Sequence, residues 1–151
     1  MKKYVLDSSV VIKWFFCEIY TDQALELKRE FDEGRARFII PQLFYSEIAN
    51  TFRQKAKAKD CSYEQGMEGL NYLEKFPFVV RSDRELFDLA YENATLYNLS
   101  AYDASYVSLA EIYVSPLITA DERMLKACKG RFDFIEHISD IKLNGASFDL
   151  S

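Results

Sequence analysis

The chain has 151 residues, the length of a single domain, and its 49% hydrophobic and 28% charged residues exclude a wholly disordered protein. Its 24 acidic side chains outnumber 19 basic ones, and the net charge of −5 argues against a protein that coats nucleic acid through bulk positive charge. A nuclease that meets phosphate groups through metal ions is compatible with this composition.

The cysteines and the hydropathy pattern narrow the class further. The three cysteines lie far apart without CxxC spacing, which predicts free thiols and neither a disulfide framework nor a zinc site: Cys17, Cys61 and Cys128. The sequence contains no run of about 18 apolar residues, so no membrane span is predicted. Lys2-Lys3 before an apolar run resembles the start of a signal peptide, but Asp7 and Lys13 interrupt that run and no small-residue cleavage site follows. We therefore expect a cytoplasmic protein.

Short apolar runs alternate with longer amphipathic segments along the chain. The short runs predict strands at Tyr4–Leu6, Phe38–Ile40, Phe78–Val80, Leu117–Thr119 and Phe132–Ile135. Helices are predicted over 21–33, 42–58, 62–74, 83–98, 101–113 and 121–126, with N-caps at Thr21, Ser62, Asp83, Ser100 and Asp121. This alternation predicts an α/β fold, a three-layer α/β/α sandwich around a mainly parallel sheet of about five short strands. We expect residues 1–141 to form this one domain and 142–151 to form a tail.

Four acidic residues are predicted to meet at one edge of this sheet. Ligands of parallel α/β sheets bind beyond the carboxyl ends of the strands. Asp7 and Asp121 follow two predicted strands, while Glu47 and Asp103 lie early in two predicted helices. Taken singly, each acid also fits a helix cap, a favourable contact with a helix dipole or a solvated position.

The four acids together favour a metal site. Glu47 and Asp103 border apolar helix faces, and no basic residue lies at the matching helical spacing from Asp103. Because acids that meet at one spot repel each other, a divalent cation would stabilise the cluster. Mg²⁺ and Mn²⁺ prefer such hard oxygen ligands. The single histidine, His137, has no nucleophile pattern near it, so we expect no part for it in the chemistry.

Four blocks of the sequence resemble the PIN-domain family, and within it the VapC-type toxins of prokaryotic toxin–antitoxin pairs. They read YVLDSSVVIKWF from Tyr4, PQLFYSEIAN from Pro41, LSAYDASYVSL from Leu99 and LITADERML from Leu117. The blocks match in order and spacing from about residue 3 to about residue 136. After the segment Trp14-Phe15-Phe16 the family often has a turn made of a proline and an acidic residue. This chain has Cys17-Glu18 there.

The resemblance implies a compact α/β/α fold and an endoribonuclease that depends on Mg²⁺ or Mn²⁺, with one or two ions held by Asp7, Glu47, Asp103 and Asp121. It places Ser9 and Thr119 beside the first and fourth acids, as groups that position water or a ligand, although both also fit capping and strand packing. It further implies an RNA substrate, a homodimer, and a small antitoxin whose flexible tail inserts an arginine among the acids.

Other interpretations remain open from the sequence. The basic run Arg53, Lys55, Lys57 and Lys59 fits an RNA-backbone contact, and it also fits a solvated helix end that complements the dipole. A phosphohydrolase with Asp7 as covalent nucleophile usually has a second Asp two residues later, where this chain has Ser9. A catalytically silent binding module on the same fold is the third alternative.

Overall fold

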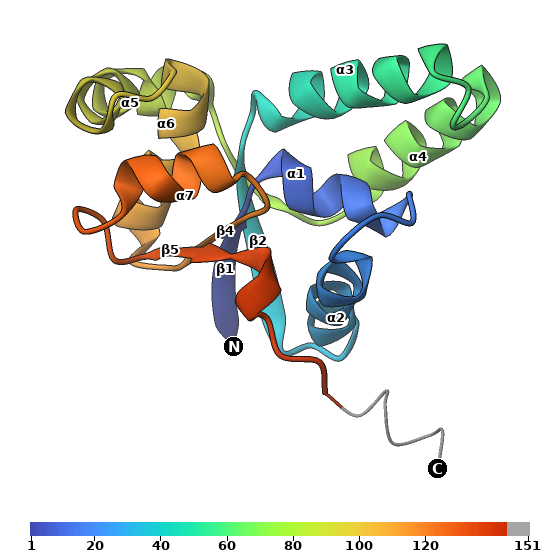
Figure 1. Ribbon diagram of the computed structural model, residues 1–151, viewed down its shortest axis with the longest axis horizontal. Helices are drawn as coiled ribbons and strands as arrows, with labels where there is room; N and C mark the ends of the chain where they lie inside the picture. Colours follow the sequence, from blue (N-terminus) through green and yellow to red (C-terminus); the bar gives the residue numbers. More distant parts are fainter. Residues whose placement is uncertain (145–151) are drawn as a thin grey trace.

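A five-stranded sheet forms the centre of the computed structural model, which describes residues 1–144 of the chain (Figure 1). Its strands are β1 (Lys2–Leu6), β2 (Ala36–Pro41), β3 (Val79–Arg81), β4 (Leu117–Thr119) and β5 (Ile135–His137). They lie in the order β3-β2-β1-β4-β5, and every neighbouring pair is parallel. The chain thus winds outward from β1 in both directions, and the crevice between β1 and β4 is the kind of switch point at which such sheets bind ligands.

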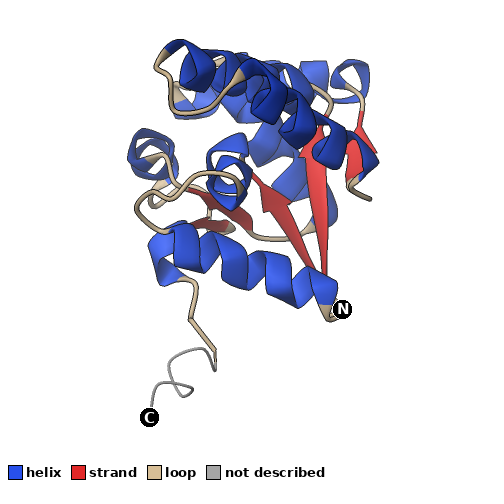
Figure 2. Cartoon of the chain, turned by 90° about the vertical axis from the view of Figure 1, so that its right-hand side faces the viewer, coloured by secondary structure: helices blue, strands red, loops and turns tan. Residues whose placement is uncertain are grey.

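Helices cover both faces of the sheet (Figures 1 and 2). One face carries α1 (Ser8–Val11), the 3₁₀ turn η1 (Ile12–Trp14), α2 (Thr21–Asp32), α3 (Phe44–Lys57) and α4 (Tyr63–Lys75). The other face carries α5 (Asp83–Tyr97), α6 (Ala101–Tyr113) and α7 (Glu122–Cys128), and the turn η2 (Ile138–Asp140) follows β5.

Alternation along the strands divides the core into two layers. Tyr4 and Leu6 of β1 pack into the cluster beneath α1, α2 and α3, whereas Val5 between them packs into the cluster beneath α5, α6 and α7. Both layers consist mainly of apolar side chains, as expected for a parallel sheet buried on two faces. The predicted α/β/α sandwich with about five short parallel strands is therefore confirmed.

Helix α4 braces α3, which carries one of the candidate site residues. A Cβ atom at Gly69 would lie 2.5 Å from Cζ of Phe52, so this close approach of the two helices requires a glycine. Ser62 caps α4 through a capping box with Gln65, as predicted for the cap residue.

The last strand was placed wrongly by the apolar pattern. Strand β5 begins at Ile135, whereas Phe132 lies in the turn after α7 and packs its ring against Tyr97. Phe132 is apolar because it fills the core beneath α5 and α6, and not because it belongs to a strand.

Two predicted helix caps were also wrong. The residue before α2 is Tyr20, in a left-handed conformation with φ 68°, and Thr21 instead accepts a bond from the Glu18 amide. Ser82 caps α5 through a capping box with Glu85, while the carboxylate of Asp83 accepts a bond from the Leu43 amide. Ser82 has the extended backbone conformation that a cap position needs, whereas Tyr20 provides no side-chain cap at the start of α2.

The end of the domain is only partly described. Within residues 1–144 the backbone amide of Asn144 donates to Glu26 Oε1 at 3.2 Å, which ties residue 144 to α2. The predicted tail over 142–151 falls mostly outside the described residues, so it stays a prediction, as does the 1–141 boundary. None of the helices within the described part of the chain is long and apolar enough to cross a membrane.

Candidate active site

The four acids predicted to meet do line one cavity, at the carboxyl ends of the strands. The cavity has a volume of about 470 Å³ and is bordered by Asp7, Glu47, Asp103 and Asp121. Asp7 follows β1, Glu47 lies in the first turn of α3, Asp103 lies in the first turn of α6 and Asp121 is the N-cap of α7. Because β1 and β4 are neighbours, Asp7 and the Asp121 loop are brought together at the switch point of the sheet.

Asp7 is held by hydroxyl groups. Its side chain forms no capping bond to α1. Instead its Oδ2 atom accepts hydrogen bonds from Ser9 Oγ at 2.7 Å and from Thr119 Oγ1 at 2.8 Å. Burial raises the pKa of Asp7, the two hydroxyl bonds oppose that rise, and the charges of Asp103 and Asp121 add to it. The capping role considered from the sequence is therefore not the role of the Asp7 carboxylate.

The two hydroxyl residues also connect the strands' ends. Ser9 Oγ accepts a bond from the Ala120 amide at 3.1 Å, and Thr119 Oγ1 accepts one from the Asp121 amide at 3.0 Å. Each hydroxyl therefore donates to Asp7 and accepts from the loop after β4, which fixes the rotamer of Asp7 relative to that loop.

The carboxylate of Glu47 accepts a hydrogen bond from a buried tyrosine. Tyr106, which is fully buried on α6, donates its hydroxyl to Glu47 Oε1 at 2.5 Å. Burial raises the pKa of Glu47 to about 7, the Tyr106 bond partly opposes the rise, and the charge of Asp7 adds to it. The pKa of Tyr106 is raised as well, mainly by burial and then by the charges of Asp7 and Glu47. Tyr106 therefore stays protonated and keeps donating to Glu47.

Asp103 and Asp121 share a basic partner that helical spacing did not predict. Arg123 Nη2 lies 3.1 Å from Asp103 Oδ2 and 3.3 Å from Asp121 Oδ2. Asp121 also caps α7, since its Oδ1 atom accepts bonds from the amides of Arg123 and Met124. Burial raises the pKa of Asp103, and the Arg123 charge opposes the rise. No basic residue lies at helical spacing from Asp103, as the sequence showed, and its basic partner comes instead from another helix.

The donor set suits a hard divalent cation. Three of the four carboxyl groups have raised pKa values through burial and mutual repulsion, which a bound cation would reverse: Asp7, Glu47 and Asp103. Within residues 1–144, however, no three His, Cys, Asp or Glu side chains are placed so that they could hold one ion together. Arg123 supplies the positive charge to Asp103 and Asp121 in this conformation. Holding an ion would therefore require side chains at this site to turn.

Two basic residues also line the cavity. Lys13 and Lys55 line it, and both bond to the single carboxylate of Glu18. Of the basic run predicted to meet RNA, only Lys55 reaches the cavity; Arg53, Lys57 and Lys59 are exposed and do not line it.

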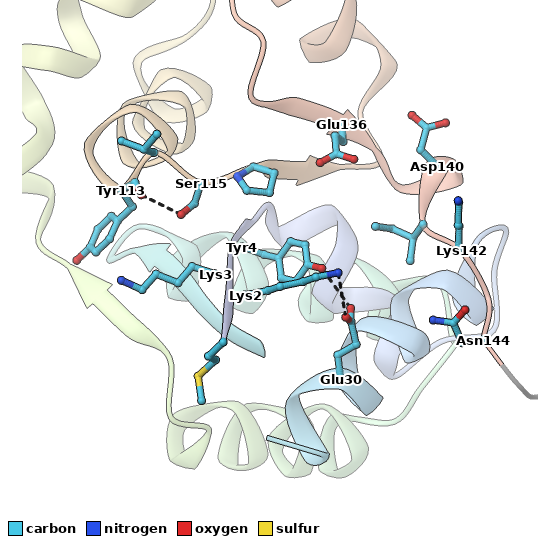
Figure 3. Close-up of a pocket in the computed structure, with 14 residues that line it drawn as sticks. Lys2, Lys3, Tyr4, Glu30, Tyr113, Ser115, Glu136, Asp140, Lys142 and Asn144 are labelled. Atoms are coloured by element: carbon cyan, nitrogen blue, oxygen red, sulfur yellow. Dashed lines mark hydrogen bonds and ion pairs between the residues drawn. The ribbon is translucent and has the colours of Figure 1, made fainter. Parts of the chain in front are cut away.

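A larger cavity of about 680 Å³ lies at the opposite, amino-terminal end of the strands (Figure 3). Part of its lining is paired around the carboxylate of Glu30. Tyr4 donates to Glu30 at 3.3 Å and Lys2 lies 4.0 Å from the same carboxylate, while burial raises the pKa of Tyr4 to about 12. None of the four acids lines this cavity. His137, which caps the turn η2, lines neither cavity.

Sequence reasoning missed four residues that take part in the site. Tyr106 lies three residues after Asp103, so the helical period could have placed both on one face of α6. In the sequence, Glu18 stood out only as part of a local departure from the family pattern. Lys13 stood out only as a charge that interrupts an apolar run. Arg123 had no sequence signal, because its contact with Asp103 depends on how α7 packs beside α6.

Comparisons with known proteins agree with this geometry. A model of the PIN domain matches residues 4–130. The VapC ribonuclease Mb0985 of Mycobacterium bovis and ribonuclease VapC9 of Mycobacterium tuberculosis are each 34% identical to the chain over 113 residues, covering 70% of it and 87% of the relative.

Solved structures share the fold. The crystal structure of PAE2754 from Pyrobaculum aerophilum superimposes with a TM-score of 0.68 at 21% identity, covering 91% of this chain and 85% of that one. A toxin–antitoxin complex from Klebsiella pneumoniae gives a TM-score of 0.63 at 16% identity, covering 89% and 97%. With the family model, the relatives and the acid-lined crevice in agreement, the chain belongs to the PIN-domain family and to its VapC group.

Proposed function

We propose that this protein is an endoribonuclease that hydrolyses RNA phosphodiester bonds with Mg²⁺ or Mn²⁺, as a toxin of the VapC type. The observation that carries the proposal is that Asp7, Glu47, Asp103 and Asp121 line one cavity at the switch point of the sheet, with raised pKa values for three of them. The ribonuclease names of relatives at 34% identity support the choice of RNA.

The four carboxylates would hold one or two ions, which supply the charge that activates a water molecule and stabilises the leaving oxygen. Ser9 and Thr119 orient Asp7, and Tyr106 orients Glu47. These hydrogen bonds restrict the rotamers of Asp7 and Glu47, which lowers the entropic cost of holding an ion. The acids that would turn are then those paired with Arg123, namely Asp103 and Asp121.

The chemistry of the cut ends tests the proposed reaction. Attack by water needs no ribose 2′-hydroxyl, so we expect internal cuts in a long single-stranded RNA without 2′,3′-cyclic phosphate ends. An RNA with a single 2′-deoxy nucleotide at a mapped cleavage position should still be cut there. Cyclic phosphate ends would show that the 2′-hydroxyl is the nucleophile and would contradict the mechanism.

Two rival functions receive less support from the site. A phosphohydrolase with Asp7 as nucleophile needs an acid or base beside it, but Ser9 is engaged in donating to Asp7 and accepting from the Ala120 amide. A silent binding module would not need four acids around one cavity with charge repulsion between them. Hydrolysis of a phosphomonoester through an aspartyl-phosphate would favour the phosphohydrolase. An RNA complex that is never cut would favour the silent binding module.

Arg123 should compete with the ion for Asp103 and Asp121. We expect Arg123→Gln to tighten Mn²⁺ binding by about two- to fivefold, the range expected for losing an exposed ion pair. Isothermal titration calorimetry measures this affinity directly. Lys126→Gln, which removes the same charge from an exposed position on the same helix, should leave the affinity unchanged. Equal or weaker Mn²⁺ binding by Arg123→Gln would show that Arg123 does not compete.

An antitoxin partner is part of the proposal, supported by the structural similarity to a toxin–antitoxin complex from Klebsiella pneumoniae. The exposed guanidinium of Arg123 pairs with Asp103 and Asp121 at the edge of the cavity, which supports an arginine as a partner for these acids. We expect the antitoxin to place an arginine of a flexible tail among the four acids. Changing that arginine to alanine should restore RNA cleavage in the complex, and an inhibitory partner that never approaches the acids would contradict this.

A homodimer is also proposed. Large apolar side chains are exposed on neighbouring helices α5 and α6, which suggests a surface that a second copy covers: Phe87, Tyr91, Leu96, Tyr102 and Ile112. Light scattering should give a mass of twice 17.6 kDa at micromolar concentration. A mass of one chain under those conditions would contradict it.

The RNA contacts of the basic run and the cellular location stay predictions. Arg53, Lys57 and Lys59 are exposed on or just after α3, where they could reach a longer RNA beyond the cavity. A cytoplasmic location is proposed with the three free thiols as support.

A further inference from the structure

Lys13, Glu18 and Lys55 form a connected group on the wall of the acid-lined cavity. Lys13 Nζ lies 3.1 Å from Glu18 Oε1, and Lys55 Nζ lies 2.8 Å from Glu18 Oε2. The three residues come from η1, the following loop and α3, and all three border the cavity together with the four acids. The group has two positive charges and one negative charge, so one positive charge is left over.

The group is held rigidly. The Lys13 side chain is only 8% exposed, and the Lys55 ammonium lies 4.9 Å from the ring centre of Phe16. The backbone amide of Glu18 donates to Thr21 Oγ1 at 2.9 Å, which fixes the loop from which Glu18 reaches both lysines. Burial alone would raise the pKa of Glu18, but the bonds from Lys55 and Lys13 lower it overall, so Glu18 stays charged.

Both ammonium groups keep donors for a ligand. An ammonium has three N–H donors. Among the described residues, the hydrogen bonds of Lys13 and Lys55 go to Glu18 alone. An anion in the cavity would stabilise the excess positive charge of this partly buried group, and the four acids of the same cavity are proposed to be neutralised by metal ions.

We propose that Lys13 and Lys55, oriented by Glu18, form a binding site for an RNA phosphate next to the phosphate that is cleaved. This inference rests on the proposed ribonuclease function. The two lysines line the same cavity as the four acids, so an RNA strand whose cleaved phosphate meets the acids would bring a neighbouring phosphate to the lysines. Glu18 fixes the two ammonium groups in place before RNA arrives, which reduces the entropy lost on binding.

The test measures binding of a fluorescently labelled 12-nucleotide single-stranded RNA of mixed sequence by anisotropy, with Mg²⁺ present. All proteins carry Asp103→Asn so that cleavage does not interfere. We expect Lys13→Met and Lys55→Met each to weaken binding about tenfold, the effect of losing a charged hydrogen bond. Each should also make the plot of log affinity against log salt less steep by roughly 0.7, the value for one phosphate contact on a single strand.

Lys28→Met is the matched control. Lys28 is also partly buried, pairs with Asp32 at 2.9 Å and lies 5.6 Å from the ring centre of Tyr72, but it does not line the cavity. We expect it to leave RNA affinity and salt dependence unchanged. Circular dichroism reports whether each variant folds, and Lys55, which is more exposed than Lys13, provides the test if Lys13→Met unfolds.

The outcomes separate this inference from the proposed function. If the parent protein binds RNA and both lysine variants bind it equally well with the same salt slope, the lysines only brace the loop at Glu18 and the phosphate site is wrong. If the parent protein itself fails to bind RNA, the proposed function and the phosphate site are both overturned.

Discussion

The Asp7→Asn variant should lose RNA cleavage by roughly a hundredfold or more, because removing a metal ligand costs several kilocalories of transition-state stabilisation. Asp7 is the most buried of the four acids, and its Oδ2 atom already accepts from Ser9 and Thr119. Asparagine keeps the shape and one acceptor oxygen, so the hydroxyl bonds and the fold should survive. Initial cleavage rates at saturating Mg²⁺ measure the effect.

The same variant should be more stable than the wild type without metal. It removes a buried charge that Asp103 and Asp121 repel, and a gain of about 1 kcal/mol would raise Tm by roughly 2–4 °C in EDTA. Asp88→Asn, an exposed change on α5, is the control and should alter neither quantity. Wild-type cleavage by a folded Asp7→Asn protein would remove Asp7 from the site.

Glu47 should make the metal-free protein less stable as the pH rises. Its pKa is about 7 in the folded protein, against an ordinary value of 4.5. Between these values the folded state binds more protons than the unfolded state, so the free energy of unfolding falls as the pH rises through this window. At pH 8 the loss is on the order of 2 kcal/mol, after allowing for solvent screening of this partly buried group.

Glu47→Gln should abolish that loss. Glutamine can still accept from Tyr106 but carries no charge, so the variant should be about as stable as the wild type at pH 4 and more stable at pH 8. Urea unfolding in EDTA across this pH range measures the difference, with the exposed Glu92→Gln as control. Parallel stability curves for wild type and Glu47→Gln would show that the Glu47 pKa is not raised. With Mg²⁺ the order should reverse at pH 8, since the ion needs the charge.

Much of the site could be predicted because it depends on backbone topology. A residue directly after a buried strand, such as Asp7, must lie at the carboxyl edge of the sheet, and parallel pairing of β1 with β4 brings Asp121 to the same place. The helix caps Ser100 and Ser62 could be predicted from local hydrogen-bonding chemistry alone. Such features are fixed by residues close together in the chain or by the strand order.

The rest depends on contacts between elements that are distant in the sequence. Arg123 reaches Asp103 only because α7 packs beside α6, and Lys13 and Lys55 meet at Glu18 only because a loop approaches α3. The Ser82 cap is different, since the pattern Ser82–Glu85 is a capping-box signal present in the sequence. The late apolar run was ambiguous because Phe132 is buried without being in a strand.

The metal requirement tests the central claim most directly. Wild-type protein stripped with EDTA is incubated with single-stranded RNA while Mg²⁺ or Mn²⁺ is added back. We predict no cleavage in EDTA and recovery that saturates with added metal, more readily above pH 7, where Glu47 is ionised. Undiminished cleavage in EDTA, or no cleavage at saturating Mg²⁺ and Mn²⁺, would contradict the assignment of the four carboxylates as a metal site for RNA hydrolysis.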